Sequence, residues 1–260
     1  MSEAQPVQVK VQNAVAVITI NNPPVNAISA PVVDGIAAAC DQMESDRSIK
    51  AAVITGTGMA FSAGADVKEI AAALKSGDAG EKSQRGIDIF SRVENLPIPI
   101  IAAINGLCLG GGLELAMSCH IRICSDRARL GQPEINLGLV PGWGGTQRLP
   151  RLIGRGKALR MILTGDPVSA PQALQLGIVD DVVPEAELVR TATGLAQRMA
   201  SKSRIAASHA LRVIREGLGT DLDAGLKLEN EAFAQVAASE DAGEGVTAFL
   251  EKRQPKFQDK

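Results

Sequence analysis

Two glutamates stand in segments that otherwise carry little charge. Glu114 follows the glycines at 110–112, and Glu134 comes twenty residues later in the segment Gly131-Gln132-Pro133-Glu134. A carboxylate in apolar surroundings needs a partner or a chemical role, because its desolvation is costly. Consecutive glycines let the backbone approach a ligand closely and leave amide N–H groups free at the start of a helix, which we expect over residues 113–119. Amides that stabilise an anion beside two carboxyl groups indicate acid–base chemistry on a carbonyl compound.

The elements around these glutamates alternate between strand and helix. Residues 7–21 alternate apolar and polar side chains and predict a β-hairpin, after which Ser29 is the expected N-cap of a helix. Residues 51–56 form a short apolar run that ends in glycine, as is typical of a buried parallel strand. Residues 98–104 and 121–125 predict further strands, with helices between them. This order predicts an α/β fold with parallel pairing and right-handed crossovers.

The last third of the chain has a different character. From about Gly154 the pattern favours helices with short breaks, and no comparably strong strand follows residues 179–183. We therefore expect a core formed by residues 1–195 and a helical C-terminal region formed by residues 196–260. The apolar faces of this region are expected to pack on a neighbouring subunit as well as on the core.

Composition excludes several classes of function. The chain has 260 residues, is 45% hydrophobic and carries a formal net charge of −2 without a strongly basic block. This balance argues against nucleic acids and anionic membranes as partners and favours a small molecule. The N-terminus lacks a leader pattern and no apolar stretch could span a bilayer, so a cytoplasmic protein is expected. No metal-ligand spacing is present, and the cysteines are expected to be buried free thiols: Cys40, Cys108, Cys119 and Cys124.

With these motifs in place, the chain resembles the enoyl-CoA hydratase/isomerase family, the crotonases. The resemblance covers nearly the whole length and rests on residues 21–28, 61–69, 110–114, 131–146 and 163–179. It implies a spiral of ββα turns with a helical C-terminal subdomain. It also implies a homotrimer or a hexamer built as a dimer of trimers, and a role in fatty acid metabolism.

The resemblance also implies roles for individual residues. The backbone N–H groups of Ala65 and Gly111 would form an oxyanion hole for the thioester oxygen of an acyl-CoA. Glu114 would orient and activate water, and Glu134 would give a proton to C2. The implied reaction is reversible hydration of a 2-enoyl-CoA to 3-hydroxyacyl-CoA. Coenzyme A is then part of the substrate, and no further cofactor is expected.

Other residues are implied to bind the substrate or its coenzyme A. Ala63, Asp66, Val67 and Lys68 flank Ala65 and would join Ala65, Gly111 and Trp143 in this role. Phe249 and Lys252 match positions that, in relatives, reach the coenzyme of an adjacent subunit.

Two residues depart from the usual family pattern. His120 stands where many stand-alone hydratases have aspartate, so enoyl-CoA isomerisation, or another reaction of the family, is kept as an alternative. Trp143 occupies a position where a small residue is usual, and its ring is expected to narrow or reshape the acyl pocket.

Functions outside the family receive less support. Gly56-Thr57-Gly58 follows a strand, but a dinucleotide fingerprint would then need glycine or alanine where Phe61 stands. Ser62 lacks the G-x-S-x-G frame of a serine hydrolase. The helix expected over residues 32–50 carries more acidic than basic side chains, which argues against RNA binding.

Overall fold

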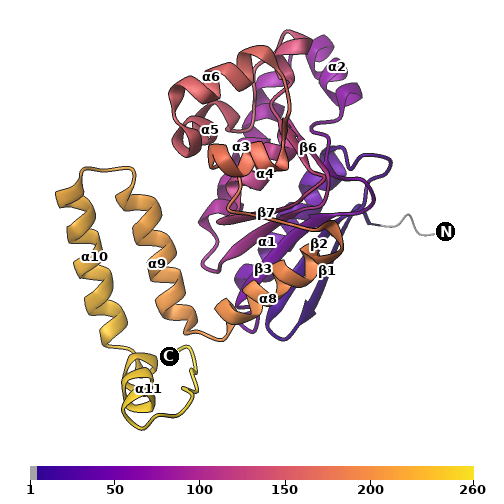
Figure 1. Cartoon of the computed structure of the whole chain (residues 1–260). Coiled ribbons are helices and arrows are strands. Elements are labelled where there is room, and N and C mark those ends of the chain that lie inside the picture. The colour runs from indigo at the N-terminus through magenta and orange to yellow at the C-terminus, as the bar shows by residue number, and fades with distance from the viewer. Residues whose placement is uncertain (1–4) are drawn as a thin grey trace.

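The computed structural model describes residues 5–260, which form two β-sheets wrapped by helices and a helical arm (Figure 1). The larger sheet contains, in spatial order, β1 (Val7–Gln12), β2 (Val15–Ile20), β3 (Ala51–Gly56), β5 (Ile100–Ile104), β7 (Ile121–Ser125) and β10 (Asp181–Val183). The smaller sheet contains β4 (Ala60–Ser62), β6 (Leu107–Leu109), β8 (Arg129–Gly131) and β9 (Val168–Ser169). The pairs β1–β2 and β8–β9 are antiparallel, and the other pairs are parallel.

The order of strands along the chain produces a spiral. β3, β5 and β7 lie in the larger sheet, and each is followed directly by a strand of the smaller sheet, namely β4, β6 and β8. Each pair therefore advances the chain by one turn, as expected for a spiral with ββα turns. The predicted α/β class, the strand at residues 51–56 and the strand at residues 121–125 are confirmed.

Helices cover both sheets and continue into the arm. They are α1 (Ala30–Ser45), α2 (Val67–Ser76), α3 (Ala79–Asn95), α4 (Gly111–Ser118), α5 (Gly145–Ile153), α6 (Arg155–Thr164), α7 (Ala170–Leu176), α8 (Leu188–Ala200), α9 (Arg204–Gly217), α10 (Leu222–Ala237) and α11 (Glu240–Leu250), with short 3₁₀ helices η1 (Glu134–Leu137) and η2 (Glu185–Glu187). Between residues 5 and 260, no helix combines the length and apolar character needed to cross a membrane.

The central strands of the larger sheet, β2, β3, β5 and β7, are buried on both faces. Along β3, Ala51 and Val53 pack in a cluster with α8, whereas Ala52 and Ile54 belong to the main core, which includes α1. This alternation follows from the two-residue repeat of a strand. A strand that is covered on both faces has a nearly continuous apolar sequence, which explains why the pattern of residues 51–56 correctly predicted a buried strand.

Two helix starts differ in detail from the sequence prediction. Ser29 is the N-cap residue of α1, but its side chain makes no capping hydrogen bond. The Glu69 carboxylate instead accepts from the Ala30 N–H at 3.0 and 3.1 Å, a contact between residues distant in sequence. Helix α4 begins at Gly111 rather than at Leu113, so the glycines form its first turn.

A buried asparagine, Asn26, holds the loop between β3 and β4 in place through hydrogen bonds. Asn26 is 1% exposed, and its amide nitrogen donates to the carbonyl oxygens of Thr57 at 2.9 Å and Ala60 at 2.7 Å. Its side-chain oxygen accepts from the Asn22 N–H at 3.0 Å. The hydrogen bond to Ala60 is buried and the other two are partly buried, so all three groups would lose a partner if the amide were lost. Asn26 therefore holds the segment that leads to Ala65.

The C-terminal helices form an arm that projects from the core. In Figure 1, α9 and α10 lie side by side as an antiparallel hairpin, and α11 lies below them near the C-terminus. Several large apolar side chains of the arm are more than half exposed in the single chain: Ile214, Leu218, Leu222, Leu226, Phe233, Val246, Phe249 and Leu250.

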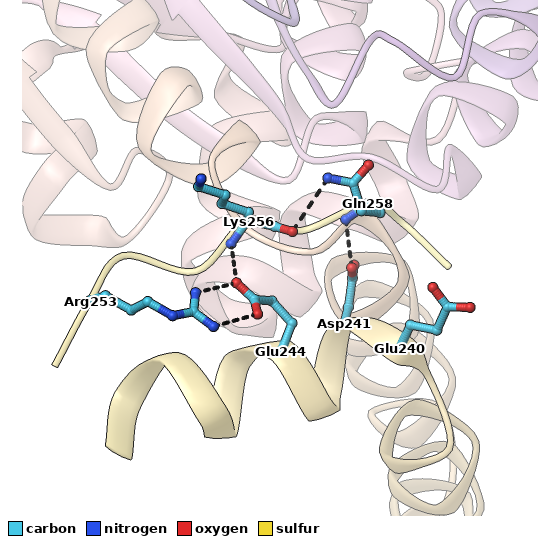
Figure 2. A pocket seen from close by; sticks show the side chains of 6 residues that line it. All are labelled: Glu240, Asp241, Glu244, Arg253, Lys256 and Gln258. Atoms are coloured by element: carbon cyan, nitrogen blue, oxygen red, sulfur yellow. Dashed lines mark hydrogen bonds and ion pairs between the residues drawn. The ribbon is translucent and has the colours of Figure 1, made fainter. Parts of the chain in front are cut away.

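The segment after α11 folds back over that helix (Figure 2). Glu244 accepts two hydrogen bonds from the Arg253 guanidinium, at 2.7 and 2.8 Å, and one from the Lys256 N–H at 2.6 Å. Asp241 accepts from the Gln258 N–H at 2.7 Å. These side chains line a cavity of about 460 Å³ that is closed on one side by the returning chain.

The end of the returning segment reaches the core. One oxygen of the Asp259 carboxylate accepts from the Lys50 ammonium at 3.0 Å and from the Arg204 N–H at 2.7 Å. Lys50 immediately precedes β3, and Arg204 opens α9. A single carboxylate therefore joins the base of the arm to the larger sheet.

Replacing the buried asparagine should destabilise the fold. We expect Asn26→Ala to lower the free energy of unfolding by about 2–4 kcal/mol, because buried carbonyl and amide groups lose their partners. Alanine would also have to adopt the positive φ of 54° at this position. Urea unfolding followed by circular dichroism measures the change, with the exposed Asn230→Ala as the matched control. A loss below about 0.5 kcal/mol would contradict this role of Asn26.

Candidate active site

The first glutamate of the site is buried and held by the backbone. Glu114 lies in the first turn of α4 and is 1% exposed. Its Oε1 accepts from the N–H groups of Trp143 and Gly145, both at 2.7 Å. A Cβ on Gly145 would lie 3.0 Å from the same oxygen, so a glycine lets the chain come this close. The turn at the start of α5 thus provides a fixed pair of donors for one carboxylate oxygen.

The second glutamate lies beside the start of the same helix. Glu134 opens η1 and is partly buried. A Cβ on Gly110, the residue before α4, would lie 2.8 Å from Glu134 Oε1. The Gln132 side chain is fully buried and, with its amide nitrogen turned toward the carboxylate, donates to the two Glu134 oxygens at 2.9 and 3.0 Å. Glu114 and Glu134 therefore both lie close to the glycine-rich turn.

Burial changes the proton affinity of both glutamates. It raises the pKa of Glu134 to about 7, with a further increase from the negative charge of Glu114 and a decrease from a hydrogen bond to its own backbone. Burial also raises the pKa of Glu114, while the Gly145 and Trp143 N–H groups and the charge of Arg148 act in the opposite direction. The two N–H groups therefore offset part of the cost of ionising Glu114, whereas Glu134 can hold a proton near neutral pH.

Two backbone amides meet at the same turn. A Cβ on Gly111 would lie 3.4 Å from the Ala65 nitrogen, and one on Gly64 would lie 3.5 Å from the Gly111 nitrogen. Within residues 5–260, neither the Ala65 nor the Gly111 N–H donates a hydrogen bond to the chain. A pair of adjacent N–H groups without acceptors can hold an oxygen that gains negative charge.

The segment after Ala65 forms the rim of the site. Asp66 is the N-cap of α2, where its carboxylate accepts from the Lys68 N–H at 2.8 Å and the Glu69 N–H at 3.4 Å. Val67 and Lys68 are exposed in the first turn of that helix. Ala63 donates its N–H to the Val25 carbonyl at 3.0 Å. Asp66 therefore orders the rim, and the exposed side chains beside it are free to meet a ligand.

The structure brings together most of the predicted site residues, but not all of them. Phe249 ends α11 and is 79% exposed, and Lys252 follows the helix. In Figure 1, α11 lies far from α4 and α2, so these two residues do not join the site of their own chain.

Ser62 and His120, which the sequence analysis singled out, both have structural roles. Ser62 is buried and its hydroxyl accepts from the Gly64 N–H at 3.2 Å, so it shapes the loop beside Ala65. His120 lies outside the site, and its Nδ1 accepts from the Ile100 N–H at 3.0 Å. Burial lowers the pKa of His120 to about 4, so the ring is neutral at physiological pH. Among residues 5–260, no group of three or more His, Cys, Asp or Glu side chains could hold a metal ion.

Sequence reasoning missed Gln132 and underestimated Gly145. Gln132 could have been noticed in the sequence as a polar residue two positions before Glu134, in the segment Gly131-Gln132-Pro133-Glu134. Gly145 belonged to a recognised motif, but its N–H contact with Glu114 joins residues 31 positions apart. Such a contact cannot be read from spacing alone.

Comparisons with known proteins agree with this architecture. The sequence profile described as enoyl-CoA hydratase/isomerase matches residues 10–260, and the chain belongs to this family. A probable enoyl-CoA hydratase of Bacillus subtilis (strain 168) is 45% identical over 252 residues, which cover 96% of this chain and 98% of that protein. The short-chain-enoyl-CoA hydratase of Clostridium acetobutylicum is 41% identical over 247 residues, 93% of each chain.

Solved structures confirm the fold. The crystal structure of an enoyl-CoA hydratase from Bacillus anthracis superimposes with a TM-score of 0.94 at 38% identity, and the match covers 98% of this chain and 100% of that one. An enoyl-CoA hydratase structure from Geobacillus kaustophilus gives a TM-score of 0.95 at 32% identity, with 100% and 98% covered. The predicted crotonase fold with its helical C-terminal region is therefore correct.

The raised pKa of Glu134 predicts a pH-dependent effect on stability. Because its pKa is about 7 in the folded chain and near 4.5 ordinarily, ionisation of the folded site costs stability as pH rises between these values. Glutamine stays neutral throughout. The stability of Glu134→Gln relative to the parent protein should therefore increase between pH 5 and pH 8.5, by on the order of 1–2 kcal/mol after allowance for solvent access.

Thermal unfolding at the two pH values measures this difference. The exposed Glu81→Gln serves as the control and should show little change at either pH. A stability difference for Glu134→Gln that is the same at pH 5 and pH 8.5 would show that Glu134 ionises normally in the folded protein.

Proposed function

We propose that this protein adds water reversibly across the C2–C3 double bond of a 2-enoyl-CoA and forms a 3-hydroxyacyl-CoA. The observation that carries the proposal is that Glu114 and Glu134 both lie close to a turn with two amides that lack acceptors in the described chain. The relatives named as enoyl-CoA hydratases support the same reaction, and they do not favour isomerisation. Coenzyme A enters as part of the substrate, and no separate cofactor is required.

The amides of Ala65 and Gly111 would bind the thioester oxygen. Their N–H groups polarise the carbonyl group and make C3 more electrophilic. They stabilise the negative charge that develops on this oxygen when water adds to C3. Because the donors belong to the backbone and are already oriented, they need little reorganisation during the reaction.

The two glutamates would divide the proton transfers. Both backbone hydrogen bonds to Glu114 end on Oε1, which leaves Oε2 to accept a proton from water as the hydroxyl group bonds to C3. Glu134 holds a proton near neutral pH, since its pKa is about 7, and gives that proton to C2. The two groups interact, so a pH–rate profile would report the titration of the pair.

Coenzyme A would lie along the rim that follows Ala65. Ala63, Asp66, Val67 and Lys68 are our candidate contacts, because they flank the oxyanion donors and the last two are exposed. Lys68 could approach a phosphate of the coenzyme without breaking a described ion pair. Phe249 and Lys252 would serve the site of an adjacent subunit, which is consistent with their distance from α4 and α2 in Figure 1.

The arm would mediate assembly into a homotrimer or a dimer of trimers. The proposal is supported by the row Leu222, Leu226 and Phe233 on α10, which are 75%, 51% and 72% exposed. Large exposed apolar side chains on one face of a helix are typical of an interface. The expected boundary between residues 195 and 196 falls within α8, whose Ala196 and Ala200 pack on the larger sheet. We therefore propose that the assembly region begins after α8.

Neutralising either glutamate should reduce hydration strongly. We expect Glu114→Gln and Glu134→Gln each to lower kcat for crotonyl-CoA by roughly 10²–10⁴-fold, because each removes one proton transfer. Loss of the enoyl absorbance measures the rate, and binding of butyryl-CoA should persist. The exposed Glu81→Gln is the matched control. A near-normal rate in either site variant would refute the assigned roles.

A charge on the exposed face of α10 should prevent assembly. We expect Phe233→Glu to reduce the molar mass in solution from that of a trimer or hexamer to that of a single chain, because a buried carboxylate would be unpaired. Light scattering coupled to size-exclusion chromatography gives the mass. Lys227→Glu places the same charge on α10 away from the apolar row and serves as the control. A mass for Phe233→Glu equal to that of the parent oligomer would contradict the assigned interface.

A further inference from the structure

One indole ring occupies space that two glycines leave open. Trp143 is the single tryptophan of the chain. A Cβ on Gly86 in α3 would lie 2.3 Å from Cδ1 and Nε1 of the ring, and a Cβ on Gly111 in α4 would lie 2.4 Å from Cζ3. Any larger residue at either position would collide with the indole. The ring therefore packs between α3 and α4 at positions where each helix has a glycine.

The glycine in α3 is explained by this contact. Gly86 lies in the middle of a 17-residue helix, where glycine is among the least favourable residues. Its φ is not positive, so the backbone itself does not require glycine. Phe90, one turn further along α3, meets the indole edge to face at a centroid distance of 5.5 Å and an interplanar angle of 83°. Together these contacts hold the ring in one orientation.

The ring lies directly beside the reacting groups. Its Cζ3 edge faces Gly111, whose N–H is one of the two proposed oxyanion donors, and the Trp143 N–H itself donates to Glu114. The side chain is only partly buried, so part of its surface remains available to a ligand. An acyl group whose thioester oxygen is held by the Gly111 N–H would have the indole as its neighbour.

We propose that the Trp143 indole closes the acyl pocket on the side of α3, so that the site selects short 2-enoyl thioesters over long ones. This inference rests on the proposed hydratase function. The indole fills the volume between α3 and α4. A smaller residue at position 143 would leave this volume to the acyl chain. Trp143 is thus a specificity-determining residue, and its backbone contact with Glu114 is independent of the side chain.

Chain-length profiles test the inference. The ratio of kcat/KM for 2-decenoyl-CoA to that for crotonyl-CoA should rise at least tenfold in Trp143→Ala and by a smaller factor in Trp143→Phe. Each methylene group that enters the freed space is worth about fourfold. The exposed Val140→Ala, in the same segment, is the control and should leave the ratio unchanged.

A second variant tests whether volume is the cause. Adding Gly86→Leu to Trp143→Ala refills the space from α3 and should restore the preference for crotonyl-CoA. If the parent protein hydrates crotonyl-CoA but Trp143→Ala leaves the ratio unchanged, the inference is wrong while the proposed function stands. If the parent protein hydrates no enoyl-CoA, the proposed function itself fails.

Fluorescence supplies a readout that does not depend on turnover or on the folding of a variant. Because Trp143 is the single tryptophan, its emission in the parent protein reports on this site alone. Butyryl-CoA should change the emission in a saturable way, whereas free coenzyme A should produce a much smaller change. Equal responses to the two ligands would show that the acyl group does not meet the indole and would overturn the inference.

Discussion

The structure around the site depends on keeping one buried carboxylate hydrogen-bonded. Glu114 lies in the first turn of α4 and is only 1% exposed, so the protein must replace most of the hydration that this carboxylate has lost. The N–H groups of Trp143 and Gly145 do so, and they require that the segment between η1 and α5 press against α4. The position of that segment then sets where the indole and Glu134 can lie.

Glycine is the second requirement of this arrangement. A side chain at Gly110 would collide with Glu134, and one at Gly111 would collide with Trp143. At Gly145 it would collide with Gln132 and Pro141 and would crowd Glu114. The glycines are therefore needed so that the start of α4, the start of α5 and η1 can approach one another closely. They do not indicate a mobile loop. Replacing Gly110 or Gly111 would disturb several groups together, because their turn carries one of the proposed oxyanion donors, borders Glu134 and leads into the helix that holds Glu114.

The sequence predicted those parts of the fold that depend on local pattern. The apolar run at residues 51–56 became β3 because a strand buried on both faces needs apolar residues at every position. Glu114 and Glu134 stood out because charge is unusual in their surroundings. The capping of α1 by Glu69 and the Gln132 contact with Glu134 could not be predicted, since each joins groups whose proximity depends on the folded chain or on side-chain orientation. Strands of two or three residues, such as β9, are too short to give a periodic signal.

The exposed apolar face of the arm links folding to protein concentration. A partner that covers Leu226 and Phe233 binds only the folded chain, because the unfolded chain has no such surface. By mass action, association then draws the folding equilibrium toward the native state, and dilution weakens that effect. In the proposed assembly, the thermal midpoint would therefore depend on protomer concentration, and the stabilities of two variants would be comparable only at the same concentration.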